Sequence, residues 1–295
     1  MAYHPDGARF RVVAYCRRIM MSDFEIRQAA RVLADARLAR GRFASLPARL
    51  HPADEATAYR IQAVLHGLLS DRGEGAYAGH KIGCTTPVMQ AYLNIHNPSA
   101  GGILLREIQQ SPALVATRGK TQLGVECEIA VRLGADLPRR SDATPYARAD
   151  LAPLISECLA TIEIVENRYV DYGRLDAATL IADDFFGAGL ILGVADRNLD
   201  PNDLDQTAAT MLIDGVGVGA GRGSDILGHP LEALAWLANS LNARGSLLRA
   251  GEVVTLGSLV ATNWVEAGST VTIVNDSLGE VTVRFAGERA RSLRR

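Results

Sequence analysis

Residues 123–132 read LGVECEIAVR, and apolar and polar positions alternate along this segment. Side chains of a strand point to opposite faces in turn, so residues two apart share a face about 7 Å from each other. All the odd-numbered residues are apolar and are expected to pack into a core. Glu126 and Glu128 project together from the other face. The pattern therefore predicts one long strand with a core face and an acidic face.

Two carboxylates side by side on a strand repel each other unless a positive group lies between them. A hard divalent cation held by carboxylate oxygens is the simplest such group. The alternative is a solvated strand face, which is the common place for acidic residues. Glu163 adds a third carboxylate, because the isoleucines on both sides of it would bury it and leave it in need of a partner. Glu126, Glu128 and Glu163 are therefore a candidate site for Mg²⁺ or Mn²⁺, and the absence of a neighbouring histidine in the sequence argues against zinc.

The composition is that of an ordinary globular protein. The chain has 295 residues, of which 48% are hydrophobic and 22% charged, and its net charge is −2. This balance gives no electrostatic reason to expect nucleic acid or an anionic membrane as a partner. No apolar run reaches the roughly 18 residues that a membrane helix needs. The four cysteines lack C-x-x-C spacing, which favours reduced thiols in a cytoplasmic protein, with Cys127 and Cys158 in the core.

Helical and strand patterns divide the chain into parts. Residues 1–20 are basic but lack a signal-peptide apolar region, so we expect an extension without chemistry. Helices are expected at 23–40, capped by Ser22, and at 55–72, with the break at DRGEG (71–75). Further helices are expected at 175–183 and 230–243, and strands at 252–259, 269–274 and 280–285. The fold class is therefore α+β, with a helical part over 21–75 and a β-rich catalytic domain over 76–295.

Lysine usage is the second informative feature. Only Lys81 and Lys120 are lysine among 31 basic residues. Arginine does not release its proton in practice, whereas lysine titrates and can transfer one. Lys81 lies on an apolar strand that ends at Gly83, where a lysine is either paired and functional or reaches solvent from the strand end. Lys120 is expected in a loop.

Four other polar residues have simpler interpretations. We expect Glu166 at the rim of the site, paired with arginine, and His66 on the surface or flank of its helix. His229, which precedes a proline, is expected to start a helix, and His80 stands alone.

Several ordered motifs resemble one family. GHKIGCT (79–85), GVECEIAV (124–131), IEIVENR (162–168), IADD (181–184), the helix segment 221–241 and GEVVTLGSL (251–259) follow one another as in the 2-hydroxypentadienoate (2-keto-4-pentenoate) hydratases. Those enzymes and the related 4-oxalocrotonate decarboxylases belong to the fumarylacetoacetate hydrolase superfamily. The resemblance covers about residues 23–285. It implies a mixed β-roll, a homo-oligomer, association with a pathway enzyme, and a small 2-oxo acid as substrate.

The resemblance also implies residue roles. Glu126, Glu128 and Glu163 would bind the metal, and Lys81 would be catalytic. Ser258, expected in a loop, would contact the substrate in the same cavity as the metal. Three further residues join this expected site, namely Asp183 in catalysis and Gly83 and Leu259 at the substrate. The implied activity is metal-dependent hydration of a short 2-hydroxy-dienoic acid to a 4-hydroxy-2-oxo acid, as in meta-cleavage degradation of aromatic compounds.

Two departures from the family pattern keep alternatives open. The hydratases usually carry an acidic residue after a proline where this chain has Ser99, and A-D-N followed by small residues where it has ADDFF (182–186). The lost acid leaves a 2-oxo acid decarboxylase as the closest rival and a C–C hydrolase as the next. Phe185 and Phe186 either reshape the pocket or pack in the core. An alternative of another class is a catalytically inactive binding or assembly partner.

Overall fold

The structure is a computed structural model that describes residues 21–140, 142 and 144–287. The predicted extension, residues 1–20, lies outside the described residues. The α-helices in the described ranges are α1 (Asp23–Ala39), α2 (Glu55–Leu69), α3 (Pro87–Leu93), α4 (Arg148–Leu151), α5 (Ala177–Ala182) and α6 (Pro230–Ala243). The strands are β1 (Tyr77–Gly83), β2 (Ser99–Leu104), β3 (Ile108–Gln110), β4 (Ala113–Ala116), β5 (Leu123–Leu133), β6 (Ile155–Glu166), β7 (Gly187–Leu192), β8 (Ala208–Ile213), β9 (Val216–Arg222), β10 (Val253–Val265), β11 (Thr270–Asn275) and β12 (Gly279–Ala286).

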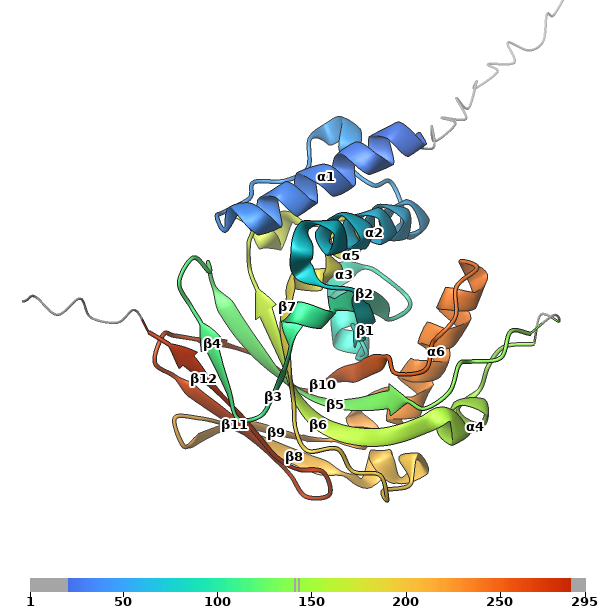
Figure 1. Cartoon of the computed structure of the whole chain (residues 1–295), viewed down its shortest axis with the longest axis vertical. Helices are drawn as coiled ribbons and strands as arrows, with labels where there is room; N and C mark the ends of the chain where they lie inside the picture. The colour runs from blue at the N-terminus through green and yellow to red at the C-terminus, as the bar shows by residue number, and fades with distance from the viewer. Residues whose placement is uncertain (1–20, 141, 143, 288–295) are drawn as a thin grey trace, which may run out of the picture.

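The strands form two mixed sheets that lie in contact. The larger sheet has the order β2-β1-β10-β5-β6-β7-β3, and the smaller has the order β4-β12-β11-β8-β9. Strand β6 of the larger sheet contacts β11 and β12 of the smaller. Figure 1 shows α1 and α2 together at one end of the molecule and the smaller sheet at the opposite end. The structure thus confirms the α+β class, with a helical N-terminal part leading into a β-rich roll.

Strands β5 and β6 run antiparallel through the middle of the larger sheet. Val125, Cys127 and Ile129 of β5 are all 0% exposed. They belong to the same buried core as apolar residues of β11 and β12. Full burial of these side chains stabilises the contact between the sheets by about 1.5–3 kcal/mol for each large aliphatic residue. The core face that the alternating sequence predicts is therefore confirmed.

The two N-terminal helices are defined by their ends. Ser22 forms a capping box with Glu25, in which each side chain accepts from the other residue's main-chain N–H. The α-helical part of α2 ends at Leu69, and Ser70–Glu74 follow as a π-helical turn that Gly73, with a φ of 93°, breaks close to the predicted end of the helix. The side chain of Gln62 then ties α2 to the rest of the molecule.

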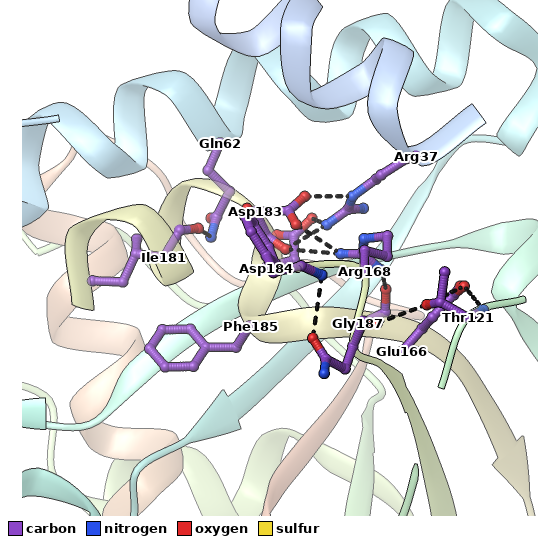
Figure 2. Close-up of polar contacts among 12 residues, drawn as sticks. Arg37, Gln62, Thr121, Glu166, Arg168, Ile181, Asp183, Asp184, Phe185 and Gly187 are labelled. Carbon is purple, nitrogen blue, oxygen red and sulfur yellow. Dashed lines mark hydrogen bonds and ion pairs between the residues drawn. The ribbon is translucent and has the colours of Figure 1, made fainter. Parts of the chain in front are cut away.

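Gln62 Nε2 donates to the main-chain oxygens of Ala100 in β2 and Ile181 in α5, at 2.8 and 2.7 Å. Figure 2 shows this side chain reaching from its helix toward Ile181. Helix α2 is therefore anchored over the β1–β2 edge of the larger sheet. The N-terminal helices also share one cluster of buried apolar residues with the strands. The division into domains at residues 75 and 76 stays a prediction.

The remaining expectations for secondary structure are met unevenly. Helix α6 has its predicted bounds, and His229 caps it by accepting from the Leu231 N–H at 3.0 Å. Helix α5 is shorter than the predicted 175–183, and β10 runs on past residue 259 to Val265. Helix α3 was not predicted, because none of its residues is buried and so no apolar stripe marks it. Helix α4, of four residues, was missed as well.

The cysteines and the helices bear on two further expectations. Cys127 and Cys158 are buried free thiols, as predicted. Among the helices that the structure describes, none combines the length and the apolar character that crossing a membrane requires.

Candidate functional site

Three glutamate side chains converge on the larger sheet. Glu126 of β5 lies directly opposite Glu163 of β6, and Glu128 follows two residues along the same face. One carboxylate oxygen from each of the three lies within 4.8 Å of the others. The convergence expected from the alternating pattern and from the apolar neighbours of Glu163 is therefore confirmed.

The cluster places negative charge where little water reaches. Glu128 and Glu163 are 2% and 4% exposed, whereas Glu126 is partly exposed. Burial, together with the charge of Glu163, raises the pKa of Glu126 and raises the pKa of Glu128 well above its ordinary value. A buried carboxylate without a positive partner is unfavourable, so this cluster needs a cation.

Lys81 supplies one positive charge beside the cluster. The residue is 5% exposed, so it does not reach solvent from the strand end. Its Nζ lies 2.5 Å from Glu163 Oε1 and donates to the main-chain oxygen of Phe185 at 2.9 Å. Burial by itself would lower the pKa of Lys81, but the carboxylates of Glu163 and Glu126 raise it above its ordinary value. The Lys81 ammonium group is therefore held beside the cluster by two hydrogen bonds.

The donor set fits a hard divalent cation. All three candidate ligand groups are carboxylates, which Mg²⁺ and Mn²⁺ prefer over nitrogen or sulfur. Three carboxylates with a single ammonium leave an excess of negative charge that a divalent ion would neutralise. Two of them are also oriented by donors, because the Thr262 hydroxyl donates to Glu126 and the Gly257 N–H donates to Glu128 at 3.2 Å.

Ser258 lies inside β10 and not in a loop, which corrects the expectation from the sequence. The register between β10 and β5 shifts on both sides of Ser258, which pairs with Glu128. Gly257 has a φ of 127°, and a Cβ there would lie 2.4 Å from the Thr85 hydroxyl oxygen. The Ser258 hydroxyl donates to the main-chain oxygen of Val260 at 2.6 Å. Such a bulge breaks the alternation of a strand, which is why the sequence resembles a loop.

Gly83 and Leu259 lie on the same two strands as Lys81 and Ser258. Gly83 ends β1, and a Cβ at this position would have no heavy atom within 4 Å. Leu259 follows Ser258 and is 8% exposed. The contact of either residue with a substrate stays a prediction.

Asp183 is held by two arginines. Its Oδ1 accepts from Arg37 Nε at 2.8 Å, and its Oδ2 accepts from Arg168 Nη2 at 2.9 Å. Figure 2 shows both guanidinium groups directed at Asp183, with Arg37 reaching from α1. Both carboxylate oxygens are thereby engaged. A catalytic role for Asp183 stays a prediction, whereas these contacts give it a role in holding the end of α5 in place.

Asp184 is the centre of a second buried ion-pair network. Its Oδ2 accepts from Arg37 Nη2 at 2.8 Å, and its Oδ1 lies 2.8 Å from His66 Nε2 and accepts from the Gly102 N–H at 2.9 Å. Burial alone would raise the pKa of Asp184, but the charges of His66 and Arg37 hold it well below its usual range. His66, predicted on the surface or flank of its helix, lies on the flank, where its side chain is 11% exposed and pairs with Asp184.

Glu166 differs from its predicted role at the rim. It is 4% exposed, and it pairs with Lys120 at 3.0 Å rather than with an arginine. Its other oxygen accepts from the Thr121 N–H at 2.8 Å. Lys120 does lie in a loop, as predicted. Both lysines of the chain thus pair with glutamates of β6, Lys81 at the cluster and Lys120 at the end of the strand.

The two departures from the family pattern also have clear places. Ser99 lies opposite Gly83 and therefore shares the sheet face of Lys81. Its side chain is buried. Phe185 is partly buried against the core, and the Phe186 ring packs edge-on against Tyr169 at 5.9 Å. These contacts favour core packing for both phenylalanines.

Sequence reasoning missed Arg37 and His66, and one signal points to His66. A Cβ on Gly101 would lie 3.0 Å from Lys81 Cγ, and one on Gly102 would lie 2.3 Å from the His66 ring. Two adjacent glycines inside a strand therefore mark a close approach on each face. Read this way, Gly101-Gly102 indicates that bulky groups press on both sides of β2.

Comparisons with known proteins identify a family and several relatives of this chain. The family described as fumarylacetoacetate (FAA) hydrolase, C-terminal, matches residues 107–286, which include the three glutamates and Ser258. The 2-keto-4-pentenoate hydratase of Paraburkholderia phymatum is 33% identical over 267 residues, covering 90% of this chain and 100% of the relative. The 2-hydroxyhexa-2,4-dienoate hydratase of Comamonas testosteroni is 32% identical over 232 residues, covering 77% of this chain and 85% of the relative.

A solved structure shows the same fold over nearly the whole molecule. The 4-oxalocrotonate decarboxylase from Pseudomonas putida G7, complexed with magnesium and adipate, matches with a TM-score of 0.82 and 25% sequence identity. The match covers 90% of this chain and 98% of that one. On the family match over more than half of its length and on these relatives, the chain belongs to the fumarylacetoacetate hydrolase family.

Proposed function

We propose that this protein is a metal-dependent lyase that adds water to a short 2-hydroxy-dienoic acid and forms a 4-hydroxy-2-oxo acid. The observation that carries this proposal is the convergence of Glu126, Glu128 and Glu163 beside Lys81. Two similar proteins are named as hydratases of such acids. Their similarity extends over most of this chain.

The three glutamates would hold the divalent cation, Mg²⁺ or Mn²⁺. When bound, the cation would supply a Lewis acid for the oxygen atoms of a 2-oxo acid and so stabilise the negative charge that develops on them. Thr262 and Gly257 would keep two of the carboxylates oriented for this task. The magnesium in the related decarboxylase structure supports the choice of a hard cation.

Lys81 would move the proton that starts the reaction. The dienol becomes a conjugated 2-oxo-3-enoic acid when C5 gains a proton and the C2 hydroxyl loses one. Water then adds its oxygen to C4 and a proton to C3. An ammonium has three donors, and the two hydrogen bonds of Lys81 leave the third for the substrate. General acid–base catalysis of this kind is worth about 10²–10⁴-fold.

Residues near Lys81 and Glu128 would bind the rest of the acid. Ser258 is paired with Glu128 in the strand register, and its hydroxyl would contact the substrate. Gly83 leaves open space at the end of β1, and Leu259 follows Ser258. We further propose that the enzyme works as a homo-oligomer in the cytoplasm, which size-exclusion chromatography and cell fractionation would test.

A 2-oxo acid decarboxylase is the second candidate, because the well-matched solved structure is a 4-oxalocrotonate decarboxylase. The same carboxylates and lysine would serve loss of CO₂ followed by protonation of the carbon that it leaves. A C–C hydrolase has less support. His80 bonds to the Tyr77 hydroxyl at 2.8 Å and His229 caps α6, so the contacts of neither histidine form a Ser–His–acid arrangement.

One assay separates these functions. The purified protein is incubated with Mg²⁺ and a panel of 2-hydroxy-dienoic acids and 2-oxo diacids, with loss of the dienol absorbance as the rate. Product mass then distinguishes addition of water from release of CO₂. We expect hydration, and we expect Glu126→Gln to abolish it. No turnover with Mg²⁺ or Mn²⁺, together with tight association with a homologous enzyme, would overturn the proposal in favour of an inactive assembly partner.

A further inference from the structure

Three consecutive residues adopt a left-handed backbone after α5. Asp184, Phe185 and Phe186 have φ angles of 54°, 46° and 66°. Left-handed conformations are unfavourable for residues with a Cβ and normally occur singly. Such a run persists only where its surroundings impose it, and strained backbone of this kind is concentrated at functional sites. The left-handed turn 184–186 therefore needs both a cause and a role.

Arg37 and His66 are two of the side chains that hold this turn, together with Arg168, which donates to the main-chain oxygens just before and just after it, at 3.3 and 3.1 Å. Arg37 donates to the Asp183 main-chain oxygen at 2.7 Å and to Asp184 Oδ2 at 2.8 Å, so it holds both backbone and side chain at the start of the turn. His66 holds the other oxygen of Asp184, at 2.8 Å. Figure 2 shows Arg37 extending from its helix to the aspartates at this turn. The Asp184 side chain is 1% exposed, which makes these charged contacts strong.

The left-handed turn 184–186 in turn holds the Lys81 side chain. The Phe185 carbonyl oxygen accepts from Lys81 Nζ at 2.9 Å. A Cβ on Gly101 would lie 3.0 Å from Lys81 Cγ and 3.3 Å from Asp184 Cα, so the lysine stem and the turn fill the same space over this glycine. Lys81 is thus aimed at the cluster by Glu163 on one side and by the turn on the other.

We propose that Arg37 and His66 are positioning residues for Lys81, acting through the left-handed turn 184–186. The N-terminal helices thereby complete the active site, although Arg37 and His66 themselves contact none of the three glutamates. The proposal rests on the proposed catalytic role of Lys81 only where activity is concerned. The position of Lys81 is measurable without any substrate.

The lysine content of the chain makes that measurement specific. Lys81 and Lys120 are its only lysines. Labelling the intact protein with isotope-coded acetic anhydride, followed by peptide mass spectrometry, gives the ratio of Lys81 to Lys120 modification. Lys120 is an internal reference in the same molecule, with a side chain 34% exposed against 7% for Lys81. A low ratio of Lys81 to Lys120 labelling is expected for the chain without substitutions.

His66→Ala should release the turn and raise the Lys81/Lys120 ratio about tenfold, the change expected from the loss of one hydrogen bond to a charged group. His66 also lines a cavity of about 760 Å³ between α2, β1 and α6. Imidazole added to the solution has room to enter there and should bring the ratio back. Intermediate ratios are expected for His66→Gln and Arg37→Lys. The first keeps a hydrogen-bond donor, and the second keeps the positive charge but loses the planar guanidinium that donates to two acceptors at once.

Arg72→Met is the control, because it breaks an exposed ion pair between α1 and the helical turn that follows α2, with Asp35, and does not involve residues 184–186. It should leave the ratio unchanged. In steady-state kinetics His66→Ala should lower kcat about tenfold, while KM and the Mg²⁺ dissociation constant stay near those of the unmodified chain.

Two results would overturn the proposal. One is an unchanged ratio in His66→Ala and Arg37→Lys with only a lower melting temperature, which is a purely structural effect. The other is a raised ratio that neither imidazole nor His66→Gln reverses, which is general loosening. Absence of turnover by the protein without substitutions would instead refute the proposed function. The labelling ratios of the variants would still test whether Arg37 and His66 position Lys81.

Discussion

Glu126 and Glu163 face each other directly across the β5–β6 pair, where like charges destabilise a sheet. Glu128, on the same face, is the most deeply buried member of the cluster. Sheet pairing thus forces three acids together at the expense of stability, and a cation that binds there recovers it. Binding of a metal by these glutamates, as proposed, would therefore raise the stability of the protein.

Glu128→Gln should raise the melting temperature of the metal-free protein at pH 8. Burial and the charge of Glu163 raise the pKa of Glu128, so its ionised form is penalised in the folded state. The penalty is absent below the unfolded pKa of about 4.3, where the carboxyl is protonated in both states, and it grows as the pH rises from there toward the raised folded pKa. A gain of about 1–3 kcal/mol, or several degrees, is expected by calorimetry.

The same variant should lose most of the stabilisation that Mg²⁺ gives to the unmodified chain. Glu266→Gln, at an exposed position, is the control and should change neither quantity. A metal-free Glu128→Gln protein that melts lower, and still responds fully to Mg²⁺, would contradict the metal site.

Lys81→Arg should reduce kcat by at least about a hundredfold, since a guanidinium keeps the charge but does not release a proton. The affinity for Mg²⁺ should stay near that of the unmodified chain, because Lys81 is not a ligand. Lys120→Arg keeps the pair with Glu166 and should remain active. Steady-state rates and calorimetric Mg²⁺ titrations check both. An active Lys81→Arg enzyme would reduce Lys81 to an electrostatic anchor.

Gly101→Ala should lower kcat, because its Cβ would lie 3.0 Å from Lys81 Cγ. Overpacking of this kind costs about 1–3 kcal/mol. The steric clash would be relieved by a shift of the Lys81 side chain or of the turn 184–186. Gly217→Ala in β9 is the matched control, since its Cβ would meet no heavy atom within 4 Å. Equal activities of the two variants would show that the space over Gly101 does not constrain Lys81.

Asp184→Asn should flatten the loss of stability in acid. Ion pairs lower the folded pKa of Asp184, so this carboxylate stabilises the protein above its unfolded pKa of about 3.9 and the stabilisation is lost as the pH falls toward the folded value. Between pH 5 and about pH 3 the free energy of unfolding of the unmodified chain should therefore fall more steeply than that of the variant. Urea unfolding at several pH values measures both slopes, and parallel slopes would contradict the ionised state of Asp184.

Ser258→Ala should raise KM by about tenfold, the effect of one lost hydrogen bond to a charged group, with a smaller change in kcat. The serine pairs with Glu128 in the register, so it is near enough to the cluster to contact the same ligand. Initial-rate measurements over a range of substrate concentrations separate the two constants. An unaltered kcat/KM would leave Ser258 with only its hydrogen bonds to the main-chain oxygens of Val260 and Cys127.

Local patterns predicted the glutamate cluster and most of the elements. The alternation in β5 places Glu126 and Glu128 together, and the isoleucines beside Glu163 predict its burial. Neither requires knowledge of distant residues. Helix α6 is equally local, because His229 and Pro230 mark its start and an apolar stripe marks its face.

The parts that the sequence did not predict depend on contacts between distant segments. No local pattern distinguishes Arg37 from the other arginines of α1. Its role depends on contacts with Asp183 and Asp184, which follow α5. The pairing of Glu166 with Lys120 likewise depends on how a loop folds back over β6. Ser258 was misplaced for a local reason, since a bulge and a loop break alternation in the same way.

The contact between Arg37 and Asp183 spans 146 residues, and that between His66 and Asp184 spans 118. A chain emerging from the ribosome must therefore complete α5 before Arg37 has anything to hold. Contacts so distant in sequence form late because loop closure opposes them. Partly made chains, and chains cut before residue 183, would contain Lys81 without the turn that directs it. Lys81 gains its contact with the Phe185 carbonyl oxygen only when nearly two thirds of the protein has been synthesised.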